Sequence, residues 1–302
     1  MSKLNTLISL LKTPRALILP IAKYGIFNWL NDEYYLKLIF WSTQGYRLNI
    51  NSPQTFSEKI QWLKLYDRKE RYINLVDKVL VKEYISNIIG DQYIVKTLGT
   101  WDSFNQIDFD SLPEQFVLKC NHDTGSIVKC RDKSTFNTKD ACTFLTKRLR
   151  RNAYYSGREW PYNMIKRKIF AEVYLESEND DLIDYKFYCF NGKAKYCQVI
   201  ANRSSKETID FYDMEWNHQP FVGLNEHAEN SNYAFQKPYN YELMKKYSEL
   251  LSKDTFFCRI DFYEVNNHLF FGEFTLYPSS GFGAFRPDDW NKKLGEMINL
   301  YI

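Results

Sequence analysis

The sequence predicts an α+β fold, with helices in the N-terminal part and antiparallel hairpins in the C-terminal part. The clearest helix start is the capping-box pattern of Thr55 and Glu58, which precedes apolar residues at helical spacing. Two pairs of aromatic and β-branched runs predict hairpins. One pair flanks Asn191-Gly192, and the other flanks Asn266-Asn267-His268.

Length and composition fit a globular protein of two or three lobes. The chain has 302 residues and a formal net charge of +3, too small an excess to predict nucleic acid binding. Basic residues concentrate between Lys147 and Lys168, which indicates either a solvated helix face or a surface for an anionic glycan, a phosphate or a membrane. The six cysteines include no CxxC pair and no secretory signal is evident, so we expect reduced thiols in a cytoplasmic protein. The four histidines lack metal-ligand spacing, which argues against zinc chemistry.

The N-terminal residues predict helices that break near Pro20 and Gly45. No apolar run reaches the length of a membrane span. The nearest is Leu7–Leu30, whose apolar residues are interrupted by Pro20 and accompanied by basic residues. Two interpretations stay open: an interfacial helix in peripheral contact with the inner membrane, and a helix docked on the body of the protein.

The remaining elements follow from hydrophobic period and from breaking residues. The expected helices cover 74–89, 138–151, 239–253 and 290–300. The expected strands cover 93–98, 116–120, 127–129, 168–176, 184–190, 193–201, 209–216, 256–265 and 269–278, and the segments 218–237 and 279–286 read as loops. Four cysteines lie in strand-like runs, where small buried hydrophobic side chains are expected: Cys120, Cys189, Cys197 and Cys258.

The register of the last hairpin can be worked out from its turn. If Val265 closes on Leu269 around a three-residue turn, Asp261 faces Glu273 across the two strands. The other pairs on this face are then Arg259 with Thr275 and Tyr263 with Phe271. A two-residue turn would place Asp261 opposite Gly272 and mix the polar and apolar faces, so the three-residue turn is favoured.

The opposed carboxylates of Asp261 and Glu273 need a neutralising partner, because like charges on facing positions repel. A pair of carboxylates on rigid strands suits Mg²⁺. The alternative is a solvated hairpin face on which both carboxylates pair with Arg259 and a lysine.

Three other polar features are candidates for a site. The small loop Asn121–Ser126 follows Lys119, and its backbone N–H groups could receive a phosphate, although it matches neither GxxxxGK[ST] nor GxGxxG and could be a plain turn. Glu172 lies among apolar residues, as an edge-strand polar residue or as a group aimed into a cleft. The Asn-Gly hairpin would place on one face the side chains of Asp184, Lys186, Tyr188, Lys195 and Cys197.

Taken in order, these residues resemble the ATP-grasp ligases, in which the nucleotide lies between two α+β subdomains. The ordered set is Asp77-Lys78, Lys82, Phe116–Lys119, Glu172, Asp184, Arg259-Ile260-Asp261 and Glu273-Phe274-Thr275. By this resemblance, the ATP phosphates would be held by Lys82, Lys119 and the loop of Asn121, Gly125 and Ser126. The adenine would be held by Glu172 and the backbone of Val173 to Leu175, and the ribose or phosphates by Asp184 or Lys186. Mg²⁺ would be held by Asp261 and Glu273, with Thr275 standing where the family usually has Asn, and Arg259 would steady the acyl phosphate.

More narrowly, five stretches resemble the subfamily named after the teichuronopeptide biosynthesis protein TupA. They are PQTFSEKIQWLKLYDR, VLKCNHDTGS, DYKFYCFNGK, FYDMEW and GEFTLYPSSGFGAF, and they extend from about residue 53 to the C-terminus. We predict an N-terminal helical extension over 1–52, a pre-grasp segment over 53–115, and an ATP-grasp domain over 116–302 with subdomains of about 116–175 and 176–302. Members are associated with extracellular or capsular polysaccharide synthesis, and some are labelled glycosyltransferases.

The resemblance implies an ATP- and Mg²⁺-dependent carboxylate–amine ligase that forms an acyl phosphate and then an amide. The acceptor would be an anionic glycan or a uronic acid precursor, combined with an amine donor. Its contacts are expected at Lys147–Lys168 and at the glycine-rich loop Pro278–Phe285. Two alternatives stay open: a glycosyltransferase or glycan kinase of polysaccharide synthesis, and a non-catalytic scaffold that binds a glycan or a membrane.

Overall fold

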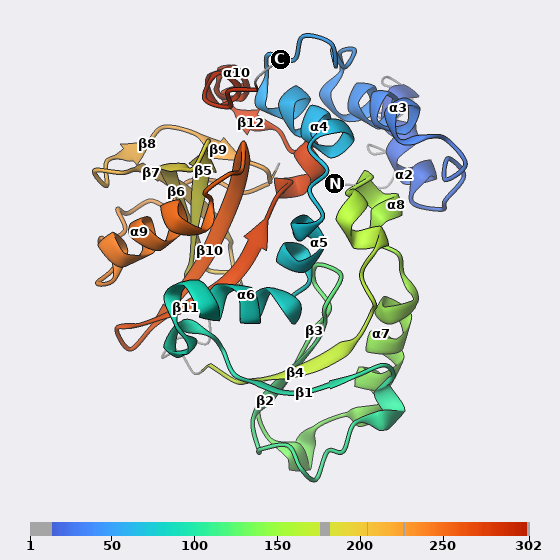
Figure 1. The fold of residues 1–302 in the computed structure, drawn as a ribbon, viewed down its shortest axis with the longest axis vertical. Coiled ribbons are helices and arrows are strands. Elements are labelled where there is room, and N and C mark those ends of the chain that lie inside the picture. The colour runs from blue at the N-terminus through green and yellow to red at the C-terminus, as the bar shows by residue number, and fades with distance from the viewer. Residues whose placement is uncertain (1–13, 176–181, 204, 226, 301–302) are drawn as a thin grey trace.

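The computed structural model describes residues 14–175, 182–203, 205–225 and 227–300. Its strands form a large antiparallel sheet of order β11-β10-β5-β6-β7-β8, a small antiparallel sheet of order β1-β4-β2-β3, and the pair β12-β9 (Figure 1). The strands are β1 (Thr97–Trp101), β2 (Phe116–Cys120), β3 (Ile127–Cys130), β4 (Ile169–Val173), β5 (Asp184–Phe190), β6 (Lys193–Ala201), β7 (Thr208–Asp213), β8 (His218–Gln219), β9 (Val222–Gly223), β10 (Phe257–Val265), β11 (His268–Thr275) and β12 (Phe285–Arg286). The predicted α+β class is confirmed.

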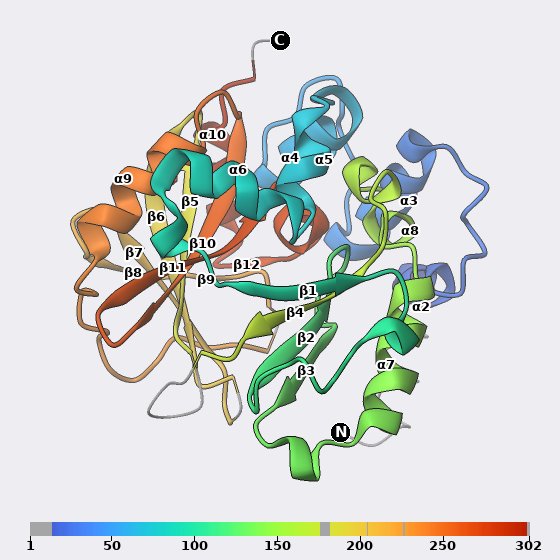
Figure 2. The ribbon, with the colours of Figure 1, turned by 60° about the horizontal axis from the view of Figure 1, so that its bottom comes forward.

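The helices cover the sheets and connect them. They are α2 (Ile18–Ala22), α3 (Asp32–Gln44), α4 (Phe56–Tyr66), α5 (Arg71–Val76), α6 (Leu80–Ile89), α7 (Thr138–Arg150), α8 (Tyr154–Gly157), α9 (Tyr241–Leu251) and α10 (Asp289–Glu296), with 3₁₀ turns that include η1 (Pro14–Leu17), η2 (Asp91–Tyr93), η5 (Trp160–Asn163) and η6 (Pro278–Gly281). Helix α9 packs on β5, β6 and β10, and α7 packs on β2. Figure 2 shows the small sheet between α7 and the large sheet. No described helix is long and apolar enough to cross a bilayer.

Buried side chains form three clusters. The largest lies between the large sheet and the helices α4, α5, α6, α9 and α10. A second joins the small sheet to α7, and a third surrounds α3 and includes Ala22, Leu48 and Ile50. The four cysteines expected in the core are buried, Cys130 is buried too, and only Cys142 on α7 is partly exposed. The domain boundaries given above stay predictions.

The β10–β11 hairpin has the predicted pairing at its base and a different turn. Asp261 faces Glu273, as predicted, but the turn has two residues, because Val265 pairs with His268. Asn266 and Asn267 both adopt positive φ, which suits a two-residue hairpin turn. A bulge between Asp261 and Phe262 absorbs the resulting shift. The prediction that Tyr263 faces Phe271 is therefore wrong, since Tyr263 pairs with Phe270.

The β5–β6 hairpin turns at Asn191-Gly192 as predicted, and it also contains a bulge. The register shifts between Tyr188 and Cys189, so that Lys186 faces Gln198 and Tyr188 faces Tyr196. The prediction that Lys195 and Cys197 share a face with Asp184, Lys186 and Tyr188 is therefore wrong. The hydroxyl of Tyr188 donates to Oε1 of Gln198 at 3.2 Å across the two strands.

The expected helix over 74–89 is two helices. Its first part belongs to α5, which ends at Val76, and α6 begins at Leu80. Between them, the carboxylate of Asp77 accepts from the backbone N–H groups of Val79 and Leu80, at 2.8 and 3.2 Å. Asp77 ends α5 in an extended conformation, and its side chain binds backbone N–H groups at the start of α6. The strand expected over 93–98 is also displaced, because Tyr93 ends a 3₁₀ turn and β1 begins at Thr97.

A candidate active site between the two sheets

The large sheet contributes a buried ion cluster centred on Asp261. The Arg259 guanidinium donates to both of its carboxylate oxygens at 2.7 Å, and Lys186 donates to Oδ2. Lys186 also lies 3.2 Å from Asp184, which Arg203 contacts at 2.8 Å. Burial would raise the pKa of Asp261, but Arg259 and Lys186 offset it and hold the pKa below its ordinary value. Asp261 is therefore an anion enclosed by two cations.

Glu273 faces Asp261 and has a cation of its own. Its carboxylate accepts from the ammonium group of Lys78, which lies between α5 and α6. Burial would raise the pKa of Glu273, but Lys78 more than offsets this effect, and the pKa lies below its ordinary value. The two carboxylates that the hairpin brings together are thus neutralised separately, Asp261 from its own sheet and Glu273 from the α5–α6 junction.

The small sheet contributes Glu172, which lies between two lysines. Its oxygens lie 2.5 Å from the ammonium groups of Lys82 and of Lys119. Lys82 also donates to the carbonyl of Val95 at 2.7 Å and to the hydroxyl of Thr97 at 2.8 Å. Burial favours the neutral form of Glu172, but Lys119 and Lys82 together lower its pKa. The two lysines predicted to hold phosphates are brought together, on the carboxylate predicted to hold adenine.

The α5–α6 junction connects these two groups. Lys78 and Lys82 are four residues apart, and each binds a carboxylate of a different sheet. The junction is fixed by Asn121, whose side chain donates to Asp77 at 2.8 Å and whose carbonyl accepts from the N–H of Lys78 at 3.1 Å. Burial raises the pKa of Asp77 despite these hydrogen bonds. Figure 1 shows α5 and α6 between the large and the small sheet.

The loop from Asn121 to Ser126 is held by its own side chains. Asn121 Oδ1 accepts from the backbone N–H of Lys168 at 2.8 Å, and the Ser126 hydroxyl accepts from that of Cys120 at 3.0 Å. Gly125 has a φ of +80°, a backbone conformation that glycine adopts without strain. Arg148 contacts the carboxylate of Asp123 at 2.7 Å. The side chains of Asn121 and Ser126 thus shape this loop, and its contact with phosphates stays a prediction.

The other predicted residues lie nearby or at the edge of the described segments. Thr275 accepts from Arg259 at 3.1 Å, next to Asp261. Val173 ends β4 and donates to the carbonyl of Lys96 at 3.1 Å, and Leu175 is the last residue described before 182. The role of Val173 to Leu175 in adenine binding stays a prediction.

The predicted basic run Lys147–Lys168 is not one surface. Arg158 is buried, and Arg148 pairs with Asp123. Lys166 and Lys168 contact Asp102 at 3.4 and 3.1 Å. Much of this charge is therefore committed within the chain, and its role toward an acceptor stays a prediction.

A buried polar group next to the loop Pro278–Phe285 was not predicted. The ammonium of Lys64, on α4, donates to Gln61 at 2.9 Å and to the carbonyls of Gly157 at 2.8 Å and Ser280 at 2.6 Å. Burial lowers the pKa of Lys64 to about 7. The hydroxyl of Ser280 donates to Glu159, and burial raises the pKa of that carboxylate. The sequence signal was a lysine next to Leu63 on the apolar stripe of α4, where a lysine side chain must be buried.

The oxygen atoms beside Lys78 fit a magnesium ion. Asp261 and Glu273 supply hard carboxylate oxygens at paired positions, and a cation, the Lys78 ammonium, already sits on Glu273. Among the described residues, no three His, Cys, Asp or Glu side chains form a metal cluster. Proteins usually hold Mg²⁺ through one or two carboxylates together with substrate phosphates and water, and the facing residues Asp261 and Glu273 supply two carboxylates.

The comparisons with known proteins give one family and several related folds. The TupA-like ATPgrasp family model matches residues 58–299. A D-alanine–D-alanine ligase from Bacillus anthracis solved with ATP has a TM-score of 0.39 and 13% identity, over 67% of this chain and 54% of that chain. The D-alanine–D-alanine ligase from Helicobacter pylori has a TM-score of 0.42 and 14% identity, over 82% and 70%. A RimK domain ATP-grasp protein from Sphaerobacter thermophilus has a TM-score of 0.41 and 11% identity, over 89% and 96%.

The match to the first of these ligases spans about half of its length. At such identities the likeness concerns the fold alone. No curated protein matches the sequence.

Proposed function

The chain belongs to the TupA-like ATPgrasp family, and on that premise we propose that it is an ATP-dependent carboxylate–amine ligase. One observation supports this most: four lysines from both sheets and from the α5–α6 junction bind buried or half-buried carboxylates. Lys186 binds Asp261, Lys78 binds Glu273, and Lys82 and Lys119 both bind Glu172. Such an arrangement suits a polyphosphate, whose negative charge can replace the carboxylates as partner of the lysines.

The proposed reaction has two steps. A carboxylate oxygen of the acceptor attacks the γ-phosphorus of ATP, and the bond from that phosphorus to the β–γ bridging oxygen breaks, which gives an acyl phosphate and ADP. The amine then attacks the acyl carbon, phosphate leaves with the electron pair of the carbon–oxygen bond, and the nitrogen loses a proton. Lys82, Lys119 and Lys186 would bind and orient the phosphates, and Arg259 would stabilise the negative charge of the acyl phosphate.

Asp261 and Glu273, with the hydroxyl of Thr275 beside them, would hold Mg²⁺. When bound, the ion would offset negative charge on the phosphate oxygens. Lys78 would have to release Glu273 to make room, and it would then be free to bind a phosphate. Lys186, which is fixed between Asp184 and Asp261, would stay in place and keep the phosphates in register with β5.

The acceptor side would be the loop that follows β11. Ser279 and Ser280 both have positive φ, at 47° and 53°, a strained conformation for residues other than glycine. Two hydrogen bonds of Ser280 fix the loop: Lys64 donates to the Ser280 carbonyl, and the Ser280 hydroxyl donates to Glu159. Glu159, a carboxylate with a raised pKa, would take the proton that the attacking amine loses.

The acceptor class that we propose is a uronic acid or another anionic glycan of cell-surface polysaccharide synthesis, and the product is its amide. A uronic acid supplies the carboxylate that the first step requires, and an amino acid or amino sugar would supply the amine.

A thermal-shift series tests the nucleotide part of the proposal, because a ligand that binds only the folded state raises the melting temperature. We expect Mg²⁺ with ATP to stabilise the protein, and Glu273→Gln to lose most of this shift. Asp289→Asn, which changes an exposed ion pair, is the matched control. Stabilisation by a UDP-sugar instead of ATP would contradict the proposal. Release of phosphate with paired uronic acids and amino acids then tests the ligation.

A further inference from the structure

Large apolar side chains are exposed over a short segment before α3. Leu17, Ile21, Tyr24, Ile26 and Trp29 are exposed within thirteen consecutive residues, and Tyr24 and Trp29 are 87% and 80% exposed. Single exposed apolar residues on a surface are common, but here five of them lie within one short stretch of the chain. We name these five residues the N-terminal apolar surface.

The same segment is attached to the protein through its other residues. Ala22 is buried, and Ile18, Leu19, Phe27 and Leu30 pack against the cluster around α3. The two interpretations of the sequence thus apply to different side chains: one set docks on the body, while the other faces outward. Tyr24 and Trp29 are therefore exposed even though the segment that carries them packs against the body of the protein.

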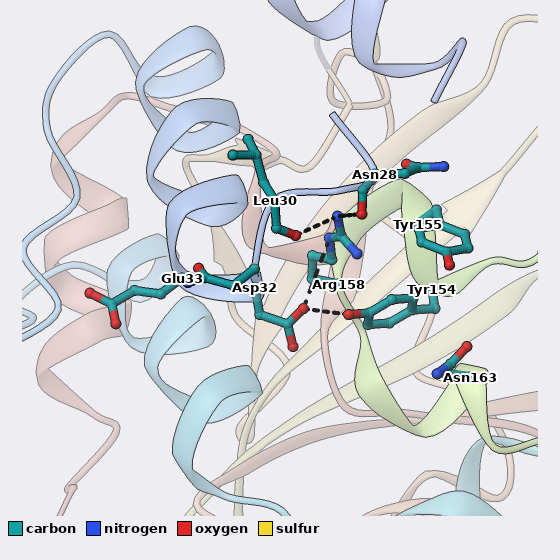
Figure 3. Close-up of a pocket in the computed structure, with 9 residues that line it drawn as sticks. Asn28, Leu30, Asp32, Glu33, Tyr154, Tyr155, Arg158 and Asn163 are labelled. Carbon is teal, nitrogen blue, oxygen red and sulfur yellow. Dashed lines mark hydrogen bonds and ion pairs between the residues drawn. The ribbon is translucent and has the colours of Figure 1, made fainter. Parts of the chain in front are cut away.

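A buried arginine holds the end of this segment (Figure 3). Arg158 donates to the carbonyls of Phe27, Asn28 and Leu30 at 3.1 to 3.3 Å and lies 4.0 Å from Asp32. Its guanidinium also lies over the ring of Tyr35, at 4.3 Å from the centroid. Arg158 fixes the residues on both sides of Trp29, so that this end of the apolar surface has a defined place on the protein.

The segment before α3 carries positive charge and no negative side chain. The described part of this segment contains two basic residues, Arg15 and Lys23, and the first acidic residue of the chain is Asp32. The sequence has two more basic residues, Lys3 and Lys12, which lie outside the described residues. A basic segment with exposed tryptophan, tyrosine and aliphatic side chains matches the interface of a bilayer with anionic headgroups, where aromatic rings sit at headgroup level and lysines meet the negative surface.

We propose that the N-terminal apolar surface docks the protein on an anionic lipid bilayer. Leu17, Ile21 and Ile26 insert among the outer parts of the acyl chains, Tyr24 and Trp29 lie at the level of the headgroups, and Lys23 faces the lipid phosphates. Docking needs no spanning helix, because the segment lies in the plane of the interface. The proposal is independent of the ligase activity.

Docking would also place the catalytic part of the chain. Arg158 follows Gly157, whose carbonyl accepts from Lys64, and Lys64 holds the carbonyl of Ser280 in the loop after β11. The membrane-facing segment is therefore joined to the proposed acceptor loop by buried hydrogen bonds. A protein docked in this way would work at a fixed distance from the membrane.

Vesicle sedimentation with the full chain tests the proposal. We expect binding to vesicles of phosphatidylcholine with phosphatidylglycerol, and much weaker binding to phosphatidylcholine alone. The double change Tyr24→Ser and Trp29→Ser should weaken the binding about tenfold or more, since it removes two large apolar groups from the interface. Lys23→Glu should weaken binding to the anionic vesicles by about fivefold or more.

The matched control is Tyr233→Ser with Tyr239→Ser, which removes two exposed tyrosines elsewhere on the chain and should leave the binding unchanged. Melting temperatures equal to that of the wild type would show that the variants are folded. The proposal is overturned by absence of vesicle binding, or by equal binding of wild type and the Tyr24/Trp29 variant. It is also overturned if the wild type is a dimer by light scattering and that variant a monomer, because a second copy would then cover the surface.

Discussion

Lys78 and Lys82 are four residues apart, yet their ammonium groups bind carboxylates that belong to different sheets. Lys78 reaches Glu273 on the large sheet and Lys82 reaches Glu172 on the small one. A short segment therefore sets the charge on both sides of the proposed nucleotide site. We expect both ion pairs to rearrange when phosphates bind, because each lysine would then divide its hydrogen bonds between its carboxylate and a phosphate.

Lys78→Met is expected to make the protein respond to Mg²⁺ in the absence of nucleotide. Without the ammonium group, Glu273 and Asp261 repel, and a divalent cation can take its place. We expect Mg²⁺ alone to raise the melting temperature of this variant by about 2 °C or more, with a much smaller effect on the wild type. Lys82→Met is the control, because its partner Glu172 lies on the other sheet. Equal responses of wild type and Lys78→Met would show that the lysine does not compete with the ion.

Asp261→Asn is expected to destabilise the protein by about 3–5 kcal/mol, because it leaves Arg259 and Lys186 buried without their shared carboxylate. Urea unfolding at neutral pH measures this loss. Lys206→Met breaks an ion pair with Glu229 in which both side chains are mostly exposed and should change the stability far less, because exposed ion pairs contribute little. If the two changes cost the same, the buried cluster contributes no more than a surface pair.

Stability is expected to rise between pH 7 and 9 because of Lys64. Its pKa falls to about 7 in the folded chain and returns to the ordinary lysine value on unfolding, so that the unfolded state binds more protons in this range. The cost of burying the ammonium is fully present below pH 7 and is relieved as the pH rises toward the unfolded pKa. The contribution is about 2 kcal/mol over these two units. Urea unfolding at both pH values should give this difference in the wild type and lose it in Lys64→Met.

Glu159→Gln is expected to slow amide formation by about 10²–10⁴-fold and to leave the thermal shift with ATP unchanged. Because the base must be ionised, wild-type activity should rise with pH through the raised pKa of Glu159, and the variant should lose this rise. Phosphate release against pH measures both effects. Glu242→Gln, at an exposed carboxylate, is the control. A variant that keeps both the rate and the pH profile would show that Glu159 takes no proton.

Local patterns predicted the elements well where the signal lies within a few residues. The Thr55 capping box, the Asn191-Gly192 turn and the pairing of Asp261 with Glu273 were all correct. The turn of the last hairpin was wrong because a bulge leaves no mark in an alternating pattern. The break at Asp77 was missed because in the sequence Asp77 looks like a polar residue on one helix face, whereas in the structure its carboxylate binds the backbone N–H groups of Val79 and Leu80.

The candidate site residues were predicted from their order along the chain, but the residues with which Lys78 and Lys64 pair were not predicted. The pairing of Lys78 with Glu273 and the burial of Lys64 were not predicted, since lysine is rarely buried. The partners of these two lysines, Glu273 and the Ser280 carbonyl, lie about two hundred residues further along the chain. No short-range signal connects such residues, because the contact exists only once the two sheets and the loop after β11 have assembled.

The burial of the cysteines allows the distance between the two sheets to be measured with fluorescent dyes. Five thiols are buried and Cys142 alone is partly exposed, on the helix that packs against the small sheet. A maleimide dye would therefore label one helix of the wild-type protein with no cysteine removed. With a second dye on a cysteine introduced at exposed Tyr239, just before α9 on the large sheet, energy transfer would follow the separation of the two sheets as nucleotide is added.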